Sequence, residues 1–527
     1  VDIDSQAVET TKLSLLLKLM EGEILESAGE LFKHSQKALL PDLKNNIKCG
    51  NSLIGSDFYT DKDMSLFGNE EIRKINTFDW EKEFPEIFYQ GGFDCVIGNP
   101  PYVRQEMISE HKEYFEKKYK SYHGMADLFT YFIEIGLKVL KNERILSFII
   151  SNRFSFTNYG ENLRLFLNNK NIEFIINFNG LLIFENANVD TMIIKIKNNE
   201  SDNKIKICNV NDSKYLNILD EHIEKNSFTA SKKYFSKNAW GFHQDKFLEL
   251  RNKIIQKGIS LSKVENIKVN RGITTGLNDI FIINEEIKNK LVKENPNSSE
   301  ILKPILKGAD IKRWFINDCK HFLIYSYTDI EIRKYTAIFN YLSQFKKELE
   351  NVWEAKNNKK KWYELRGCNY YSEFAKEKII WTRLSNINSF AISKNKEFSL
   401  DSTSFLISNA PKYYCALLNS KVIFFYFKLS CVIWGKDGIK WFGNNFDDIP
   451  LHIINFNNPF EKQSHDQLIT LVDQMLEAQK EYHNSATDDF SRRLIKQKID
   501  AIDTQIDNLV YKLYDLTDEE IRVVEGS

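Results

Sequence analysis

The tetrapeptide Asn99-Pro100-Pro101-Tyr102 brings together groups that can act on an amino nitrogen. The side-chain oxygen of Asn99 and the carbonyl oxygen of Pro100 can accept both N–H hydrogens of an exocyclic amine as positive charge develops on its nitrogen. The prolines restrict φ, so both acceptors are held in place before a substrate arrives. Tyr102 adds a flat ring on which an extruded base can stack. The pattern therefore favours chemistry on an exocyclic amino group, with a plain tight turn as the structural alternative.

An apolar segment, Phe93–Gly98, directly precedes the tetrapeptide and predicts a buried strand of a parallel sheet. Ligands of open α/β sheets bind at the carboxyl ends of the strands, so the tetrapeptide has the position that its chemistry needs. Strand-like and helix-like segments alternate around it, which predicts a doubly wound α/β fold. The other expected strands are 46–49, 145–151, 174–178 and 191–196, and the expected helices are 5–20, 126–140 and 159–167.

Composition narrows the class of protein. The 527 residues carry 72 basic and 73 acidic side chains, so a nucleic-acid surface must come from the arrangement of charge rather than from an excess. The seven cysteines form no C-x-x-C pair, which argues against a disulfide framework or a zinc site, and we expect no metal. No apolar run approaches the ~18 residues of a membrane span, and no leader pattern opens the chain. We therefore expect a cytoplasmic protein with no membrane partner.

The tetrapeptide resembles the catalytic motif of amino-group DNA methyltransferases, and its Asn-Pro-Pro-Tyr form is similar to the N6-adenine branch. The resemblance implies methyl transfer from S-adenosylmethionine to the N6 of adenine in duplex DNA, with the target base flipped out of the helix. The implied catalytic residues are Asn99, Pro100, Pro101 and Tyr102. Residues 183–187 resemble the family loop whose aromatic ring stacks on the second face of the base, which implies Phe184 for this role, with a core position as the alternative.

Three further segments resemble the cofactor-binding motifs of that family. Val1-Asp2-Ile3-Asp4 is similar to the second motif, so Asp2 would hydrogen-bond the ribose hydroxyls of S-adenosylmethionine, whereas an N-cap is the alternative. Residues 48–53 resemble the third motif, with Asn51 where an aspartate is usual, and Asn51 would contact the adenine ring unless the segment is only a strand-ending turn. Residues 125–129 resemble the segment that lines the cofactor on its other side, which implies Asp127.

The Gly-rich first motif of the family would stand before Asp2, and no later segment can replace it. We therefore expect the methyltransferase domain to be incomplete at its N-terminus and the chain to be inactive without upstream residues. A catalytically inert DNA-binding specificity fragment of a bifunctional restriction-methylation enzyme is the alternative. Such proteins often place a nuclease upstream, so a nuclease domain or subunit is a candidate partner.

Several later segments resemble the TaqI-type target-recognition domain, namely residues 271–281, 303–314, 362–366, 378–383 and 417–420. Basic and aromatic residues alternate between residues 353 and 366, which suits phosphate neutralisation and base stacking, whereas a solvated basic loop is the alternative. The expected partner is double-stranded DNA with a specific recognition sequence. The predicted DNA-binding residues are Arg271, Lys312, Arg313, Lys360, Lys361, Trp362, Arg366 and Arg383.

These resemblances and a change of texture after residue 197 predict three parts, as in fused type II restriction-modification enzymes. Residues 1–215 would form the S-adenosylmethionine-dependent methyltransferase domain, without its first strand-helix unit. Residues 216–460 would form a mixed α/β target-recognition domain. Residues 461–527 would form a C-terminal helical segment, in which amphipathic helices at 467–482 and 489–514 make a hairpin.

Overall fold

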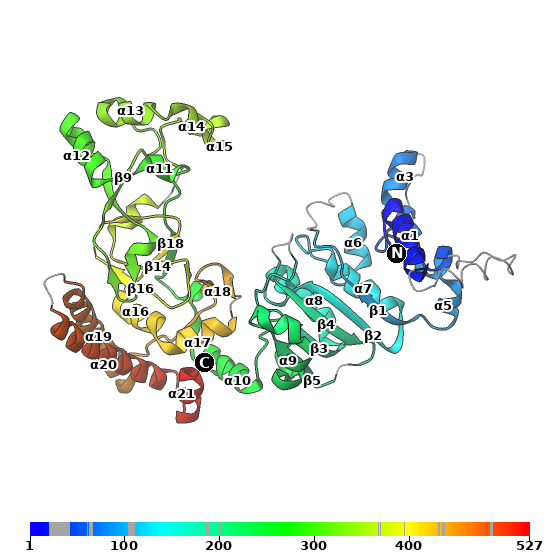
Figure 1. Ribbon diagram of the computed structural model, residues 1–527. Helices are drawn as coiled ribbons and strands as arrows, with labels where there is room; N and C mark the ends of the chain where they lie inside the picture. Colours follow the sequence, from blue (N-terminus) through cyan, green and yellow to red (C-terminus); the bar gives the residue numbers. More distant parts are fainter. Residues whose placement is uncertain are drawn as a thin grey trace, which may run out of the picture. The chain divides into compact units, whose positions relative to one another are not determined.

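The computed structural model describes residues 1–20, 43–60, 62, 67–103, 111–184, 189–200, 202–366, 368, 370–394, 396–430, 433–434, 438–484 and 488–526. It divides into two compact units, Val1–Gln244 and Asp245–Ser527 (Figure 1). The first unit continues past residue 215, the predicted end of the methyltransferase domain. The reason is that β6 (Phe228–Ser231) pairs with β5 (Lys204–Asn209) and so completes the sheet of this unit.

The first unit is built on a six-stranded sheet with the order β1-β2-β4-β3-β5-β6. β1 (Phe93–Gly98) runs parallel to β2 (Leu140–Ser151), and β3 (Asn171–Asn177) runs parallel to β5. β4 (Thr191–Lys197) is antiparallel to both of its neighbours, so the sheet is mixed. All four strands predicted between residues 93 and 196 are confirmed. β1, β2, β3 and β5 run in the same direction, so their carboxyl ends lie on the same side of the sheet.

Helices cover both faces of this sheet. Ile175 and Ile176 of β3 point to opposite faces, as successive strand residues must. Ile175 packs in the core that contains α7 (Phe129–Val139) and α8 (Glu161–Asn168). Ile176 packs in a smaller core together with residues of α9 (Leu219–Asn226). The predicted mixture of helices and strands is therefore confirmed, with one layer of helices on each side.

The prediction that Phe93–Gly98 is buried is wrong. Within the described residues β1 has a strand neighbour only on the β2 side, so it forms an edge of the sheet. Ile97 is 83% exposed and Cys95 is also exposed, although both belong to an apolar segment. Local sequence sets the apolar character of a strand, but the neighbouring strands decide whether it is covered.

The N-terminal segments pack beside this edge. α1 (Ser5–Met20) is the helix predicted there, whereas the strand predicted at 46–49 is reduced to the single parallel bridge between Asp2 and Cys49. A small core joins Leu53 and Phe58 to Phe115 and to Tyr131 of α7. The short helices of this region are α3 (Asn69–Ile75), α4 (Trp80–Glu83), α5 (Pro85–Tyr89) and α6 (Lys112–Lys118).

The second unit contains an antiparallel sheet with the order β16-β14-β18-β8 that separates two cores. Ile379 and Trp381 face a core made largely by helices, whereas Ile380 faces a core shared with a second sheet, β17-β10-β13-β9. The strands are β8 (Lys268–Arg271), β9 (Ile282–Asn284), β10 (Leu302–Leu306), β13 (His321–Ile324), β14 (Lys378–Thr382), β16 (Phe390–Ser393), β17 (Phe398–Ser399) and β18 (Thr403–Ile407).

The helical core of this unit includes the C-terminal helices. α19 (Pro459–Tyr482) and α20 (Asp489–Leu513) lie side by side, which confirms the predicted hairpin (Figure 1). The other α-helices described in the unit are α10 (Asp245–Lys257), α11 (Asn278–Phe281), α12 (Glu285–Glu294), α13 (Thr336–Ser343), α14 (Lys346–Glu350), α15 (Trp353–Lys356), α16 (Pro411–Asn419), α17 (Lys421–Ser430), α18 (Asn444–Asp447) and α21 (Asp518–Glu525). Among the described residues, no helix is long and apolar enough to cross a membrane, and no group of acidic, histidine and cysteine side chains is arranged to hold a metal ion.

Candidate functional site

A cleft of about 790 Å³ lies between the N-terminal segments and the open edge of β1. Its volume falls within the range of ligand sites, which is about 300 to 1,000 Å³. Apolar side chains make most of its wall. Its polar members include Asp2, Asn51 and Asn99, and Pro100 and Pro101 line it as well. The structure thus places five of the predicted site residues on one cavity.

The tetrapeptide leaves the carboxyl end of β1. Asn99 is exposed at the cleft and Pro100 is buried. The Tyr102 hydroxyl donates to the carbonyl oxygen of Ile149 in β2 at 3.3 Å. Burial raises the pKa of Tyr102 to about 12, so the hydroxyl stays protonated and keeps this bond at neutral pH. The strand next to β1 therefore fixes the position of the Tyr102 ring.

Phe184 faces Tyr102 from the segment that follows β3. The two ring centroids are 6.2 Å apart and the ring planes are inclined at 55°. The rings touch each other, so a base that stacks between them has to part them. The structure brings this predicted pair together, whereas residues 185–187 of the predicted loop lie outside the described residues.

Asp2 presents a carboxylate at the far wall of the cleft. Its backbone bridges Cys49, with the Gly50 amide donating to the Asp2 carbonyl at 2.8 Å. Its Oδ1 accepts the backbone N–H of Asp4 at 2.9 Å, and its Oδ2 has no hydrogen-bond partner in the described part of the chain. One carboxylate oxygen is therefore available to accept a hydroxyl from a ligand.

Asn51 lies next to Asp2 on the same wall. Its Oδ1 accepts the backbone N–H of Leu53 at 3.1 Å, while its Nδ2 donates to no described residue. The backbone here must pass close to a ring, because a Cβ on Gly50 would lie 2.4 Å from Cδ2 of Phe78. Glycine thus lets residues 50–51 approach Phe78, and this approach sets where the amide of Asn51 stands.

Asp127 does not line the cleft. Its Oδ2 accepts the hydroxyl of Tyr159 at 3.2 Å, and its carbonyl oxygen accepts the Thr130 hydroxyl at 2.9 Å at the start of α7. The neighbouring Leu128 does line the cleft, and its backbone N–H donates to the carbonyl of Val103, just after the tetrapeptide. In this structure Asp127 therefore supports the wall, and its contact with a cofactor stays a prediction.

In the second unit, Arg271 and Arg383 converge on one residue, Asp401. Arg271 ends β8, and its Nη2 lies 3.2 Å from Oδ2 of Asp401, while Nη1 of Arg383 donates to the Asp401 carbonyl at 3.2 Å. The Arg383 guanidinium also lies over the ring of Phe442 at 3.8 Å. Burial and the charge of Arg271 lower the pKa of Arg383. Two guanidiniums share one acid, so the cluster keeps a net positive charge.

The predicted basic loop is partly committed to contacts inside the protein. Lys360 donates to the carbonyl of Glu364 at 2.8 Å, and burial lowers its pKa. Arg366 pairs with Glu354 at 2.7 Å, yet its side chain is 57% exposed. Lys361 is exposed, although its ammonium lies 3.6 Å from the carboxylates of Asp329 and Glu364. Trp362 is half-buried and packs against Phe339 at 5.8 Å between ring centroids. The exposed members, Lys361 and Arg366, keep the strongest case as predicted phosphate contacts.

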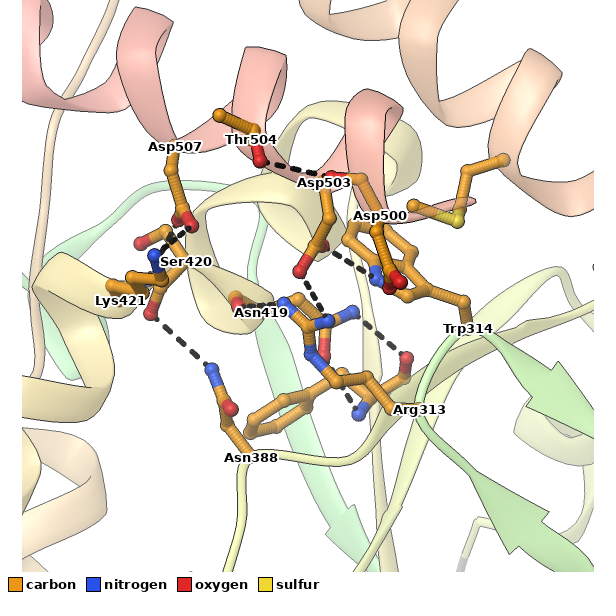
Figure 2. Close-up of polar contacts among 12 residues, drawn as sticks. Arg313, Trp314, Asn388, Asn419, Ser420, Lys421, Asp500, Asp503, Thr504 and Asp507 are labelled. Carbon is orange, nitrogen blue, oxygen red and sulfur yellow. Dashed lines mark hydrogen bonds and ion pairs between the residues drawn. The ribbon is translucent and has the colours of Figure 1, made fainter. Parts of the chain in front are cut away.

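Arg313 and Lys312 differ although they are neighbours. Figure 2 shows the guanidinium of Arg313 between α20 and the end of α16, where Nη1 lies 2.6 Å from Oδ2 of Asp503 and Nη2 donates to the Asn419 carbonyl at 2.8 Å. These contacts tie Arg313 to α20 and α16, and its role on DNA stays a prediction. Lys312 is exposed and has no acidic partner among the described residues, so its prediction stands.

Sequence reasoning missed two acceptors that organise these regions. Asp401 lies in the turn before β18, where an acid is common and signals nothing. Asn177 ends β3 in a buried position and accepts hydrogen bonds from two segments. The only indication in the sequence that Asn177 has a structural role is that a polar residue ends an apolar strand. The local pattern does not reveal its hydrogen-bond partners.

Comparison with known proteins finds a match for each of the two regions described above, the cleft in the first unit and the basic residues in the second. A family model described as Eco57I restriction-modification methylase matches residues 1–184, and one described as TaqI-like C-terminal specificity domain matches residues 303–451. The chain is 26% identical to the type II restriction enzyme and methyltransferase RM.Eco57I of Escherichia coli, over 100% of this chain and 55% of that protein. It is 22% identical to the type II methyltransferase M.BstVI of Geobacillus stearothermophilus, over 87% of this chain and 79% of that protein.

A solved structure shares the fold. The type IIL restriction-modification enzyme MmeI, solved in complex with DNA, aligns with a TM-score of 0.56 at 13% identity and covers 86% of this chain and 58% of that chain. The likeness at this identity concerns the fold alone. The chain spans only a little over half of MmeI and of RM.Eco57I.

Proposed function

We propose that this chain methylates the N6 of adenine at a specific site in duplex DNA. It carries an Eco57I-type restriction-modification methylase domain and a TaqI-like specificity domain, and so belongs with the type II restriction-modification methyltransferases. One observation carries the proposal. The acceptors of Asn99 and Pro100, at the end of β1, line the same cleft as Asp2 and Asn51. The remainder of the restriction-modification system would include a nuclease outside this chain, by analogy with RM.Eco57I, whose name states both activities.

The residues at the cleft suit S-adenosylmethionine. Oδ2 of Asp2 and Nδ2 of Asn51 have no partner among the described residues. The first can accept the ribose hydroxyls, and the second can donate to an acceptor on the edge of the adenine ring. A neutral amide in place of the usual aspartate can donate but carries no charge. The bound cofactor would supply the methyl group, on a sulfonium centre that makes it electrophilic.

The chain's own groups would activate and hold the target base. Asn99 Oδ1 and the Pro100 carbonyl would accept the two N–H hydrogens of the adenine amine and so stabilise the positive charge that develops on nitrogen during direct displacement. Tyr102 and Phe184 would stack on the two faces of the flipped base after their rings part. The nitrogen would then release one proton to solvent as its lone pair returns.

The test is incubation of an N-terminally extended protein that contains this chain with labelled S-adenosylmethionine and mixed-sequence duplex DNA, followed by digestion to nucleosides. We expect N6-methyladenine, and we expect Asn99→Ala to lower the rate by about 10²- to 10³-fold, the usual effect of removing one preorganised polar group. Asn168→Ala, an exposed asparagine at the end of α8, is the matched control. Methylated cytosine in place of methyladenine, or an unchanged rate for Asn99→Ala, would contradict the proposal.

A second candidate is a DNA-binding specificity fragment that is inert by itself. The exposure of Ile97 on β1 favours it, because an apolar strand edge that faces the cleft is what a further strand would cover. We therefore expect the chain alone to methylate slowly or not at all and an N-terminally extended protein to methylate. Equal activity of both proteins would rule out the need for upstream residues, and equal DNA affinity with and without cofactor would favour the inert fragment.

A further inference from the structure

We propose that Asn177 is a positioning residue that fixes the ring of Phe184. The inference rests on the proposed function, in which Phe184 stacks on the target base, and it names the group that sets the position of that ring. Asn177 is the last residue of β3 and is 5% exposed. It lies at the carboxyl ends of the parallel strands, on the same side of the sheet as Asn99, which follows β1.

The carboxamide of Asn177 joins the carboxyl ends of three strands. Its Oδ1 accepts from Nδ2 of Asn152, directly after β2, at 3.2 Å, and its own Nδ2 donates to Oδ1 of Asn209, at the end of β5, at 3.2 Å. Nδ2 of Asn209 donates in turn to the carbonyl of Phe242 at 2.8 Å. These three amides form a ladder across the edge of the sheet, and Asn177 is its middle member.

The same oxygen of Asn177 begins the turn that follows β3. It accepts the backbone N–H of Asn179 at 3.4 Å, which is the local side-chain bond that Asn uses to start a turn. Asn179 and Gly180 then both take positive φ angles, 45° and 85°. Asn and Gly both tolerate this region, and the turn is held by the oxygen of Asn177 together with a bond from Nδ2 of Asn179 to Oδ1 of Asn211 at 2.8 Å.

Phe184 follows this turn closely. The backbone N–H of Leu181 donates to the carbonyl of Phe178 at 2.9 Å, and Leu181 and Ile183 pack against the core of Ile176 and Phe178. The next residue is Phe184, which meets Tyr102. Tyr102 is bound to Ile149 of β2, and Asn177 is bound to Asn152 just after β2, so both rings take their positions from the same strand.

The first experiment requires neither DNA nor cofactor. 4-Fluorophenylalanine is placed at position 184 of this chain, and its ¹⁹F resonance is recorded in the parent and in Asn177→Ala. We expect the substitution to shift and broaden the resonance, because the ring loses its single packing against Tyr102. Asn198→Ala is the matched control, since Asn198 holds the carbonyls of Leu140 and Lys141 at the opposite end of β2. An unchanged resonance, or an equal change in the control, would overturn the inference.

The second experiment is a double-mutant cycle in the full-length protein that contains this chain, with S-adenosylmethionine and mixed-sequence duplex DNA. We expect Asn177→Ala to lower the single-turnover rate by about 10- to 100-fold, as a misplaced contact does, with little change in DNA affinity. In the Phe184→Ala background the same change should cost less than about twofold, because the two residues act as one unit. Independent, multiplying effects would overturn the inference.

Asn177→Asp guards against a folding defect. Its protonated carboxyl keeps the acceptor for Asn152 and Asn179 and can donate to Asn209, so in acidic buffer we expect it to retain the ¹⁹F resonance of the parent; a folded Asp variant that has the altered resonance of Asn177→Ala in acidic buffer would overturn the inference. The two experiments also separate this inference from the proposed function. A resonance that responds to Asn177→Ala supports the positioning of Phe184 even if the full-length protein forms no methyladenine, and that second result would contradict only the function.

Discussion

The guanidinium of Arg313 lies 2.6 Å from the carboxylate of Asp503, and this pair joins the turn between β11 (Ile311–Lys312) and β12 (Phe315–Ile316) to helix α20 (Figure 2). Trp314 strengthens the junction, since its indole N–H donates to the other oxygen of Asp503 at 3.3 Å. An arginine that follows an exposed lysine in a basic segment is thus a structural anchor. Substitution of Arg313 should therefore change the stability of the chain, whereas substitution of Lys312 should change its binding to DNA.

We expect Arg313→Ala to lower the free energy of unfolding of this chain by about 3 kcal/mol, because it leaves the half-buried carboxylate of Asp503 without a cation and removes the bond to the Asn419 carbonyl. Lys312→Ala should leave stability within about 0.5 kcal/mol, as surface changes usually do. It should reduce the log-log salt dependence of binding to mixed-sequence DNA by about one unit. Urea unfolding and fluorescence anisotropy at several salt concentrations measure both. A stability loss for Lys312→Ala equal to that of Arg313→Ala would contradict the assignment.

Asp507 gives a prediction for pH. It lies one turn beyond Asp503 on α20, and its Oδ1 accepts the backbone N–H of Lys421 at 2.9 Å (Figure 2). Burial raises the pKa of Asp507 to about 6 in the folded chain, from 3.8. The folded state therefore holds this proton more tightly than the unfolded state, so the contribution is stabilising below pH 3.8 and is lost as pH rises through 6.

We expect Asp507→Asn to remove this dependence. The difference in free energy of unfolding between the variant and the parent should change by about 3 kcal/mol between pH 4 and pH 8, in favour of the variant at pH 8. Urea unfolding at several pH values measures it. Asp500→Asn is the control on the same helix, because Asp500 is exposed and pairs with Lys496. A constant difference between the Asp507 variant and the parent would show that Asp507 titrates normally.

Gly50 tests the wall of the cleft. A methyl group there would meet Phe78 at 2.4 Å, so we expect Gly50→Ala to cost about 1 to 3 kcal/mol of stability, as overpacking does. It should also weaken S-adenosylmethionine binding through the displaced amide of Asn51. Gly68→Ala is the matched control, because nothing lies within 4 Å of a Cβ at that position. Thermal unfolding and calorimetric titration decide the matter, and equal behaviour of the two variants would refute the close approach.

Asp401 tests the paired arginines. Asp401→Asn keeps the shape of the side chain but removes the charge that pairs with Arg271 and acts on the nearby Arg383. We expect tighter binding to mixed-sequence DNA and a salt dependence steeper by about one unit, since one more cation is free to neutralise a phosphate. Asp318→Asn, an exposed acid in the same unit, controls for the change in net charge. Weaker binding by Asp401→Asn would mean that Asp401 mainly orients the two arginines.

Much of the first unit could be predicted from sequence because its signals are local. The apolar run 93–98, the prolines that follow it and the helical spacing of 5–20 each occupy a few consecutive residues, and the structure has the expected strand and helices there. The burial of β1 could not be predicted in this way. It depends on which strand stands on the other side of β1, and β1 has only one described neighbour.

Partners that are distant in sequence account for the remaining differences. Arg313 and Asp503 are 190 residues apart, and Asn177 and Asn209 are 32 residues apart. The local pattern around Arg313 resembles a basic DNA-binding segment whether or not an acid from another helix reaches it. Burial and pairing, which decide the role of a charged or amide side chain, come from the packing of whole elements.

The sequence by itself determined which groups follow β1: two acceptor oxygens beside two prolines, and then an aromatic ring. Only the tertiary structure decided that Asp2, Asn51 and Asn99 share one cavity and that Asp127 does not line it. The physical reason is that residue type and nearest neighbours fix what a group can do, whereas strand order and helix packing fix which groups meet.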